Sequence, residues 1–220
     1  MKKWTQEELD EFLRDGTDIY SSKPPITGDI SGLHVRDVSC AYARFGSANE
    51  SLLARGTSFD GAWLRSSCFY AVDLSDTTFR HTMLRGARFE ACLLRNADFS
   101  EVDGLRFTHF PLSNLEGAKF PSNLSVPRIE NIDRAVYTAT TQPGCGLGMG
   151  DWHQPCGTVH CWAGWVTTLA GPAGARLEHM LGTDAAASII YAASGSHPVP
   201  NWYMRDDDEA LELMKERAGL

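Results

Sequence analysis

The chain has 220 residues, a formal net charge of −8, 43% hydrophobic residues and six scattered cysteines. This length and apolar content allow one or two packed domains. No apolar run approaches the roughly 18 residues of a membrane-spanning helix, and the opening "MKKWTQEELDEF" lacks the apolar centre of a secretory signal. We therefore expect a cytoplasmic protein with reduced cysteines.

The negative charge is unevenly distributed along the chain. Residues 1–26 hold four basic and six acidic side chains, residues 27–121 hold ten and eleven, and residues 122–220 hold six and eleven. The middle segment is therefore close to neutral. The acidic run "DDDE" at 206–209 is typical of a helix start, where negative charge is favourable.

The first predicted element is a short helix in "WTQEELDEFL". Thr5 is a suitable N-cap, Glu8 follows it by three residues, and Trp4 can pack on Leu9. We expect this helix to cover the open edge of the structure that follows, because an uncovered sheet edge invites aggregation.

From residue 59 the chain repeats every five residues. A period of five fits neither a helix nor a strand. It predicts a coil in which each five-residue unit forms one side of a square, with about 20 residues per coil. The residue two places before each large one is small or β-branched and also points inward. The large residues are Phe59, Leu64, Phe69, Leu74, Phe79, Leu84, Phe89, Leu94 and Phe99.

This pattern resembles the pentapeptide-repeat family, whose consensus is A(D/N)LXX; "ARFEACLLRNADFS" at 87–100 is a good instance. The resemblance covers about residues 28–121 and implies a right-handed quadrilateral β-helix. After Phe99 the spacing slips by one residue near Asp103. Because Phe and Leu continue to alternate, we expect a bulge within one continuous coil. Residues 46–56 lose the spacing, which predicts a loop.

Stacking of units four apart places three arginines above one another on one side of the coil. Arg65, Arg85 and Arg106 each follow a large inward residue, and Trp63 and Met83 lie beside them. Like charges stacked about 5 Å apart are either screened by solvent or used to bind an acidic or planar partner. We take Trp63, Arg65, Met83, Arg85 and Arg106 as the candidate binding residues.

After Pro121 the repeat ends and helices are predicted. They cover "VPRIENIDRAVYTAT", starting at Pro127, "VHCWAGWVTTLAG", capped by Thr158, and then "PAGARLEHMLG", "TDAAASIIYAAS" and "RDDDEALELMKERAG". The predicted domains are therefore a capping helix and linker (1–26), a β-helix (27–121) and an α-helical domain (122–220). The block "DWHQPCGTVHCWAGWVTTLAG" resembles segments of uncharacterised bacterial and prophage proteins.

The segment "CGTVHCWAGW" at 156–165 allows three interpretations. "QPCGTVHCWA" resembles the papain-type motif, which would make Cys161 a nucleophile with His197 and Asn201 as partners. However, three residues separate Gly157 from Cys161 where that family has one, and only 59 residues follow Cys161.

The second interpretation is a zinc site made by His153, Cys156, His160 and Cys161. Neighbouring helical positions point about 100° apart, so His160 and Cys161 cannot easily bind one metal. The third interpretation is the start of a central buried helix with Cys161 in its core and Gly164 admitting a close backbone. We favour this third interpretation and expect no metal, no cofactor and no catalytic set.

The leading functional prediction is a non-enzymatic interaction protein, phage or prophage derived, that binds and modulates a host protein or protein complex, possibly one associated with nucleic acid. Some members of the resembled family inhibit DNA gyrase through an acidic rod that imitates duplex DNA. The neutral coil departs from that pattern, so mimicry is an alternative. A small thiol or zinc enzyme in the C-terminal domain is the third candidate.

Overall fold

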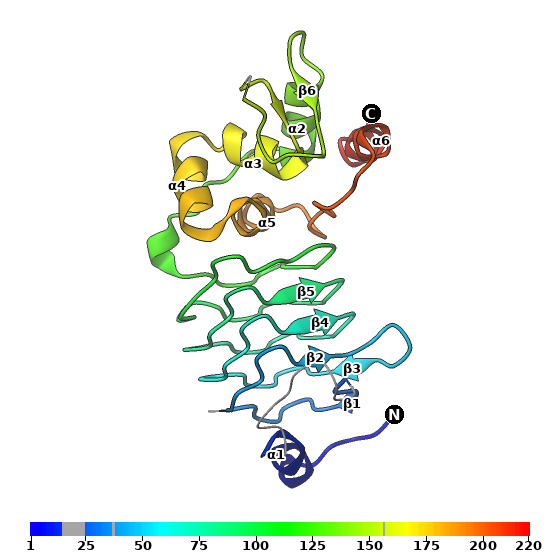
Figure 1. The fold of residues 1–220 in the computed structure, drawn as a ribbon, viewed down its shortest axis with the longest axis vertical. Helices are drawn as coiled ribbons and strands as arrows, with labels where there is room; N and C mark the ends of the chain where they lie inside the picture. The colour runs from blue at the N-terminus through cyan, green and yellow to red at the C-terminus, as the bar shows by residue number, and fades with distance from the viewer. Residues whose placement is uncertain (15–24, 37, 156) are drawn as a thin grey trace. The chain divides into compact units, whose positions relative to one another are not determined.

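The chain folds into two compact units, Met1–Leu124 and Ser125–Leu220, in a computed structural model that describes residues 1–14, 25–36, 38–155 and 157–220. Figure 1 shows the first unit as a stack of coils with one helix at its start and the second as a group of helices. Among the described residues, no helix is long and apolar enough to cross a membrane.

The first unit is a β-solenoid held by parallel backbone pairing. β4 (Cys68–Tyr70) pairs with both β2 (Arg44–Phe45) and β5 (Arg88–Glu90), and β1 (Gly28–Asp29) pairs with β3 (Leu52–Leu53). Further rows of parallel bridges join partners 20 positions apart, which is the length of one coil. They are Ser58↔Thr78, Trp63↔Met83, Asp73↔Leu93 and Thr78↔Asp98. The predicted β-helix is thereby confirmed, while its right hand and square section stay predictions.

Stacked phenylalanine rings fill the axis of the coil. The rings of Phe59 and Phe79 stack with centroids 5.2 Å apart, and those of Phe79 and Phe99 stack at 4.7 Å. A second column contains Phe69 and Phe89, stacked at 4.7 Å, and the two columns meet edge to face. All five side chains are fully buried. Aromatic pairs of these geometries stabilise a core beyond the burial of their area.

The corners of the coil have left-handed backbone. Two residues after a large inward residue, φ is positive even where the residue is not glycine. Such residues cost free energy unless the surrounding structure holds them. Here backbone hydrogen bonds from coil to coil hold them, as in Ala71 N–H to Glu90 O at 2.9 Å. The corner residues include Tyr42, Ser66, Ala71, Asp76, His81, Ala91, Asn96, Phe107 and Leu112.

The register slip is a bulge, as predicted. Asp103 donates its N–H to Thr82 O at 3.1 Å, and Gly104 O accepts from Leu84 N–H at 3.2 Å. Asp103 and Gly104 therefore stand together opposite Met83. Beyond the bulge, bridged partners such as Leu93 and Asn114 are 21 positions apart. Asp103 is exposed, so its carboxylate avoids the axis.

The predicted loop at 46–56 is wrong in its second half. Leu52 and Ala54 are buried, and Ala54 N–H bonds to Asp73 O at 2.9 Å, so the coil has already resumed there. The repeat was hard to recognise here because Leu52 occupies the inward position that usually holds a small residue. Ala54 occupies the inward position, five residues before Phe59, that usually holds Phe or Leu. The loop begins at Gly46, where φ is +74° and a Cβ would lie 2.5 Å from Tyr70 O.

The helix α1 (Gln6–Arg14) begins with the predicted capping box. Glu8 N–H bonds to Thr5 Oγ1 at 3.2 Å, and Thr5 N–H bonds to Glu8 Oε2 at 2.8 Å. Leu9 and Leu13 are buried. The preceding residues pair with the first coil, because Trp4 N–H bonds to Asp29 O at 3.0 Å. The predicted linker falls largely on residues 15–24, which lie outside the described residues.

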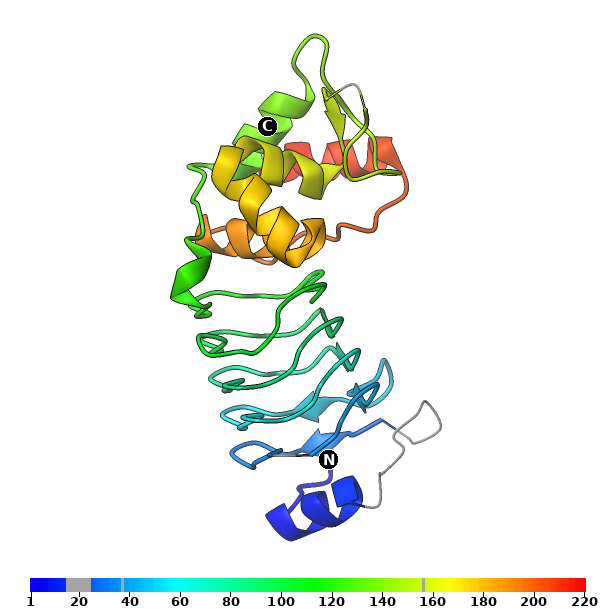
Figure 2. The same ribbon diagram turned by 60° about the vertical axis from the view of Figure 1, so that its left-hand side comes forward.

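The second unit consists mainly of helices, seen from a second side in Figure 2. The helices α3, α4 and α5 pack on one another, and α2 packs on α6. Trp162, Tyr191 and Trp202 are buried between them. The elements are α2 (Ile132–Thr140), β6 (Gly146–Leu147), β7 (Val159–His160), α3 (Trp162–Leu169), α4 (Gly171–Leu181), α5 (Thr183–Ala193) and α6 (Asp207–Arg217); η1 (Ser122–Leu124) ends the first unit.

Two helix starts in this unit were predicted wrongly. The helix expected from Pro127 begins only at Ile132, because Asn131 has left-handed backbone with φ 49°. The helix expected from Thr158 begins at Trp162, because residues 159–160 pair with 146–147 as a short parallel ladder. Cys161, rather than Thr158, is the N-cap: its Sγ accepts from Gly164 N–H at 3.3 Å.

The axial packing can be tested with neighbouring residues. Phe79→Ala should lower the free energy of unfolding by about 3–5 kcal/mol, because it opens a cavity in the ring stack. Arg80→Ala, which removes a half-exposed guanidinium from its ion pair with Asp98 at 3.1 Å, should cost only about 1 kcal/mol. Urea unfolding followed by far-ultraviolet circular dichroism measures both. Equal losses would show that Phe79 does not pack on the axis.

Candidate functional site

The structure brings the five predicted binding residues together on one face of the coil. Ser66 N–H bonds to Arg85 O at 3.1 Å and Gly86 N–H bonds to Arg106 O at 3.2 Å, so the three arginines sit on successive coils. Trp63 and Met83 are bridged partners, 58% and 45% exposed. We call this surface the arginine face; its residues are Trp63, Arg65, Met83, Arg85 and Arg106, all of them exposed.

The arginine face differs in its ion pairing from four other arginines of the coil. These four are matched by carboxylates: Arg55 with Asp73 and Asp76, Arg80 with Asp98, Arg88 with Glu90, and Arg95 with Glu116. Arg65, Arg85 and Arg106 make no ion pair with any residue that the structure describes. Their positive charge is therefore uncompensated and faces solvent.

Two exposed aromatic residues flank the arginine face and were missed by the sequence analysis. Tyr42 is 47% exposed and Phe107 is 42% exposed. Tyr42 N–H bonds to Arg65 O at 3.0 Å, and the Arg106 guanidinium lies 4.9 Å from the centre of the Phe107 ring. Both occupy left-handed corners, at the position directly after the arginine column. The repeat could have predicted this position, because it is the residue that directly follows the arginine column in each coil.

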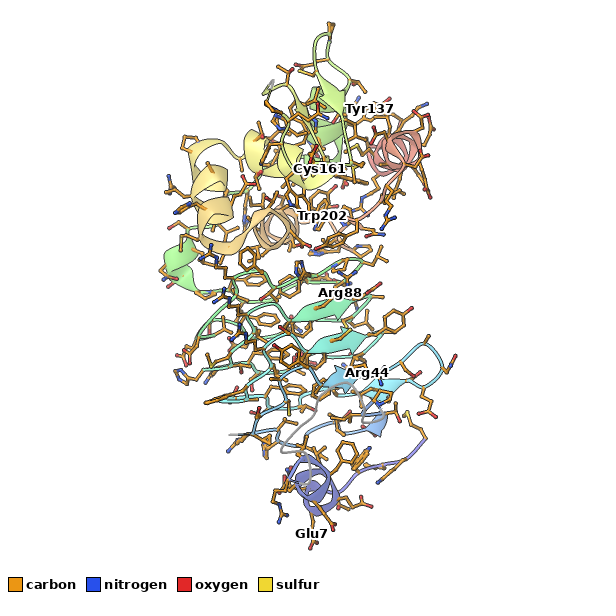
Figure 3. All side chains as sticks on the ribbon, viewed as in Figure 1. Glu7, Arg44, Arg88, Tyr137, Cys161 and Trp202 are labelled. Atoms are coloured by element: carbon orange, nitrogen blue, oxygen red, sulfur yellow. The ribbon has the colours of Figure 1, made fainter. Side chains whose placement is uncertain are left out.

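A second group of basic residues follows the next side of the coil. The bridges Arg44↔Cys68 and Cys68↔Arg88 place Arg44 and Arg88 in one column, two coils apart, and Figure 3 labels both on the coil. Arg88 bonds to Glu90 through Nε at 2.8 Å. In this column the charge of Arg88 is therefore balanced by a nearby carboxylate, whereas the arginines of the arginine face have no such partner.

Cys161 is placed in the core of the helical unit. It is 1% exposed, and burial raises the pKa of its thiol to about 11. A thiol with that pKa is protonated at neutral pH and is a poor nucleophile. Gly164 has the predicted role, since a Cβ there would lie 2.0 Å from Trp152 O. In Figure 3, Cys161 and Trp202 both lie among the helices of this unit.

His153 and His160 form a hydrogen-bonded pair. His153 Nε2 lies 2.7 Å from Glu178 Oε1, and His160 Nε2 lies 3.2 Å from Gly157 O. A carboxylate and a carbonyl only accept, so each Nε2 must carry a hydrogen. The two Nδ1 atoms lie 2.9 Å apart and face each other.

Burial lowers the pKa of His160, and the charge on His153 lowers it further. Protonation of His160 is therefore unfavourable in the folded chain.

The structure gives the zinc interpretation no support in the part that it describes. Among those residues no three His, Cys, Asp or Glu side chains group to hold a metal ion. His153 and His160 bond to each other, and Glu178 binds the far side of His153. The fourth candidate ligand, Cys156, lies outside the described residues.

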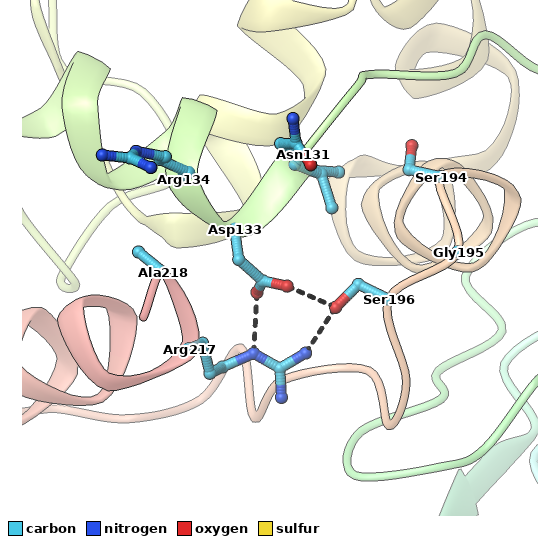
Figure 4. A pocket seen from close by; sticks show the side chains of 9 residues that line it. Asn131, Asp133, Arg134, Ser194, Gly195, Ser196, Arg217 and Ala218 are labelled. Carbon is cyan, nitrogen blue, oxygen red and sulfur yellow. Dashed lines mark hydrogen bonds and ion pairs between the residues drawn. The ribbon is translucent and has the colours of Figure 1, made fainter. Parts of the chain in front are cut away.

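A polar pocket of about 380 Å³ lies at the start of α2 and the end of α6. Figure 4 shows its central triangle: Arg217 Nε donates to Asp133 at 2.8 Å, Ser196 Oγ donates to Asp133 at 2.5 Å, and Arg217 donates to Ser196 at 2.8 Å. Tyr191 OH also donates to Asp133. These groups form their hydrogen bonds with one another. We therefore interpret the cluster as a structural contact that holds α2, α5 and α6 together.

Comparisons with known proteins identify the repeats. A family model described as pentapeptide repeats matches residues 73–103 with eight copies. No curated protein is similar enough in sequence to match the chain.

Several solved structures are similar to the chain, and three of them illustrate the likeness. One is a pentapeptide-repeat protein of the Arabidopsis thaliana thylakoid lumen, 27% identical over 53% of this chain and 77% of that chain, with a TM-score of 0.28. Another is QnrB1, a plasmid-mediated fluoroquinolone resistance protein, 17% identical over 43% of this chain and 54% of that chain, with a TM-score of 0.32. The third is Rfr23, a pentapeptide-repeat protein of the cyanobacterium Cyanothece 51142, 17% identical over 46% of this chain and 60% of that chain, with a TM-score of 0.24. The matches thus span less than two thirds of the last two chains.

The His153–His160 pair predicts a loss of stability in acid. The folded-state pKa of His160 is lowered from 6.5. As the pH falls below about 6.5, the unfolded chain gains a proton that the folded chain does not, so the free energy of unfolding decreases. Tryptophan-monitored urea unfolding between pH 8 and pH 5 measures this slope. His160→Gln should flatten it, and His179→Gln, at an exposed histidine of α4, should not. Parallel slopes for all three proteins would contradict the assignment.

The absence of a structural metal remains a prediction. Purified protein should contain less than about one zinc per chain, and its thermal unfolding should not change in chelator, because structural zinc contributes directly to folding. Elemental analysis measures the zinc content, and thermal unfolding with and without chelator measures the change in stability. Stoichiometric zinc, with unfolding when it is removed, would contradict this expectation.

Proposed function

We propose, from the premise that residues 73–103 are pentapeptide repeats, that the protein is a non-enzymatic interaction protein. Its arginine face binds an acidic protein surface. The observation that carries this proposal is the contrast in charge pairing. Arg65, Arg85 and Arg106 stand uncompensated in one column, whereas Arg55, Arg80 and Arg95 on the other sides of the coil have carboxylate partners.

The composition of the arginine face supports a protein partner. Arginine, tryptophan, tyrosine and methionine are enriched at protein interfaces, and tryptophan and arginine are common among the residues that dominate binding energy. Trp63 and Met83 offer apolar contact beside the charges, and Tyr42 and Phe107 flank them. The backbone beneath is hydrogen-bonded from coil to coil, so little backbone conformational entropy is lost on binding.

The same face disfavours nucleic acid and DNA mimicry. Duplex DNA presents one negative charge per about 1.7 Å, and proteins that bind it spread many cations along it. Three arginines on successive coils span about 10 Å, and the remaining faces of the coil carry carboxylates. A mimic of DNA would need an extended acidic surface, yet residues 27–121 hold ten basic and eleven acidic side chains.

The partner class follows from the source that the sequence suggests. From the bacterial and prophage resemblance suggested by the sequence of the C-terminal block, we propose a phage-derived protein that acts on a host protein or protein complex in the cytoplasm. The buried, protonated thiol of Cys161 gives no support to a thiol enzyme. Binding, rather than chemistry, is therefore the function that we assign.

The proposal is tested with three full-length proteins and two labelled probes. The probes are a fluorescent decaglutamate peptide and a fluorescent 20-base-pair DNA duplex. Replacing Arg65, Arg85 and Arg106 by Gln should weaken decaglutamate binding about 10-fold at low salt, because each exposed pair contributes about 0.2–1 kcal/mol. Fluorescence anisotropy at micromolar protein measures the change.

The matched control removes the same number of arginines from the paired sides of the coil. Arg55, Arg80 and Arg95 replaced by Gln should bind decaglutamate within about twofold of the parent, since their charges are already compensated. Equal losses in both triple variants would show a general charge effect and would overturn the proposal. Arginine-dependent binding of the duplex that is tighter than binding of the peptide would replace the protein partner by nucleic acid.

A further inference from the structure

We infer that a second copy of this chain can occupy the arginine face through an acidic stripe on α6. The inference rests on the proposed function, because it takes the arginine face to be a binding surface for carboxylates. It adds a named occupant and a form of regulation: self-association and partner binding would compete for the same residues.

The acidic stripe is defined by Glu209, Glu212 and Glu216. These residues are spaced i, i+3 and i+7 on α6, so they fall within about 60° of arc on one side of the helix. All three side chains are exposed. No ion pair joins them to any described residue, so their negative charge also faces solvent without compensation.

The other charges of α6 do not neutralise this stripe. Arg217 is committed to Asp133, with Nε 2.8 Å from Oδ1. Lys215 is the one remaining cation of the helix; it is half-buried, follows Glu212 by three residues and lines the same groove, so one cation lies beside three carboxylates without an ion pair to any of them. Asp207 and Asp208 add further negative charge in the first turn. The stripe therefore belongs to a region of net negative potential.

The spacing of the two surfaces agrees. Successive coils are about 4.8 Å apart, so the three arginines extend over about 9.6 Å. Glu209 and Glu212 are about 4.5 Å apart along the helix axis and Glu212 and Glu216 about 6 Å, a total of about 10.5 Å at 1.5 Å per residue. A helix lying along the coil axis can therefore set three carboxylates opposite three guanidinium groups. Arginine suits this contact because its planar fork can bind a carboxylate with two parallel hydrogen bonds.

Apolar surface accompanies the charges on both sides of the contact. A groove of about 460 Å³ runs beside the acidic stripe and is lined partly by Met204, Leu213 and Leu220. Leu220 is 56% exposed. The arginine face offers Trp63 and Met83 at the edge of its own charged column. Apolar contact of this kind excludes water from the ion pairs and strengthens them.

Each copy carries one arginine face and one acidic stripe, so the contact joins different surfaces of two copies. This permits a complementation test with full-length variants. The face variant has Arg65, Arg85 and Arg106 replaced by Gln, and the stripe variant has Glu209, Glu212 and Glu216 replaced by Gln. Neither should self-associate, whereas their mixture retains one intact face and one intact stripe and should form a 1:1 dimer.

Sedimentation velocity at 1–100 µM protein measures the outcome. The parent should gain mass with concentration in 20 mM salt and lose that gain in 500 mM salt, since the Debye length shortens to a few ångström. Either variant alone should weaken association about 10-fold or more, and mixing should restore it. A control with Glu7→Gln, Glu130→Gln and Asp151→Asn removes three exposed acidic groups that lie outside α6 and should associate like the parent.

Three results would overturn the inference: a parent that stays monomeric at 100 µM, single variants that associate like the parent, or a mixture of the two variants that stays monomeric. The decaglutamate experiment separates this failure from that of the proposed function. If the peptide still binds in an arginine-dependent manner, the arginine face is a binding surface and only its occupancy by a second copy is wrong. If the peptide does not bind, the proposed function itself is wrong.

Discussion

The five-residue packing of the axis is the constraint on which the first unit depends. Phe59, Phe79 and Phe99 stack ring on ring, and the backbone of each coil bonds to the next. Because the axis admits an inward pair only every five residues, each outward residue has a fixed side and a fixed neighbour one coil away. The packing of the interior thus determines which residues of the solenoid point outward and on which side. The alignment of the three arginines in one column follows from it.

This constraint explains why so much of the first unit could be predicted. The inward residues, the bulge near Asp103 and the placement of the five candidate binding residues on one face all follow from counting positions. The charge pairing could not be counted, because whether Arg80 reaches Asp98 depends on side-chain conformation. The resumption of the coil at Leu52 was also missed, since Leu52 and Ala54 exchange the usual large and small places.

The second unit lacks such a repeat, so only its local signals could be read. The helices α4, α5 and α6 follow their patterns within a residue or two, and the acidic run does begin a helix, with Asp206 as its N-cap. The failures involve contacts between distant residues. Pairing of 159–160 with 146–147 takes His160 out of the predicted helix, and this placement turns its ring toward His153. No local sequence pattern predicts this ladder, because it pairs two segments that are separated in the sequence.

The contrast between satisfied and unsatisfied groups decides where function is assigned. In the helical unit the chemically suggestive groups have partners: Asp133 accepts from Arg217, Ser196 and Tyr191, and His153 lies between Glu178 and His160. Groups that complete one another hold a fold together and leave little to offer a ligand. The arginine column and the acidic stripe have the opposite character, with exposed charge, apolar neighbours and no ion pair among the described residues. Binding partners complete interactions that folding leaves open, and for that reason we propose the arginine face and the acidic stripe as binding surfaces.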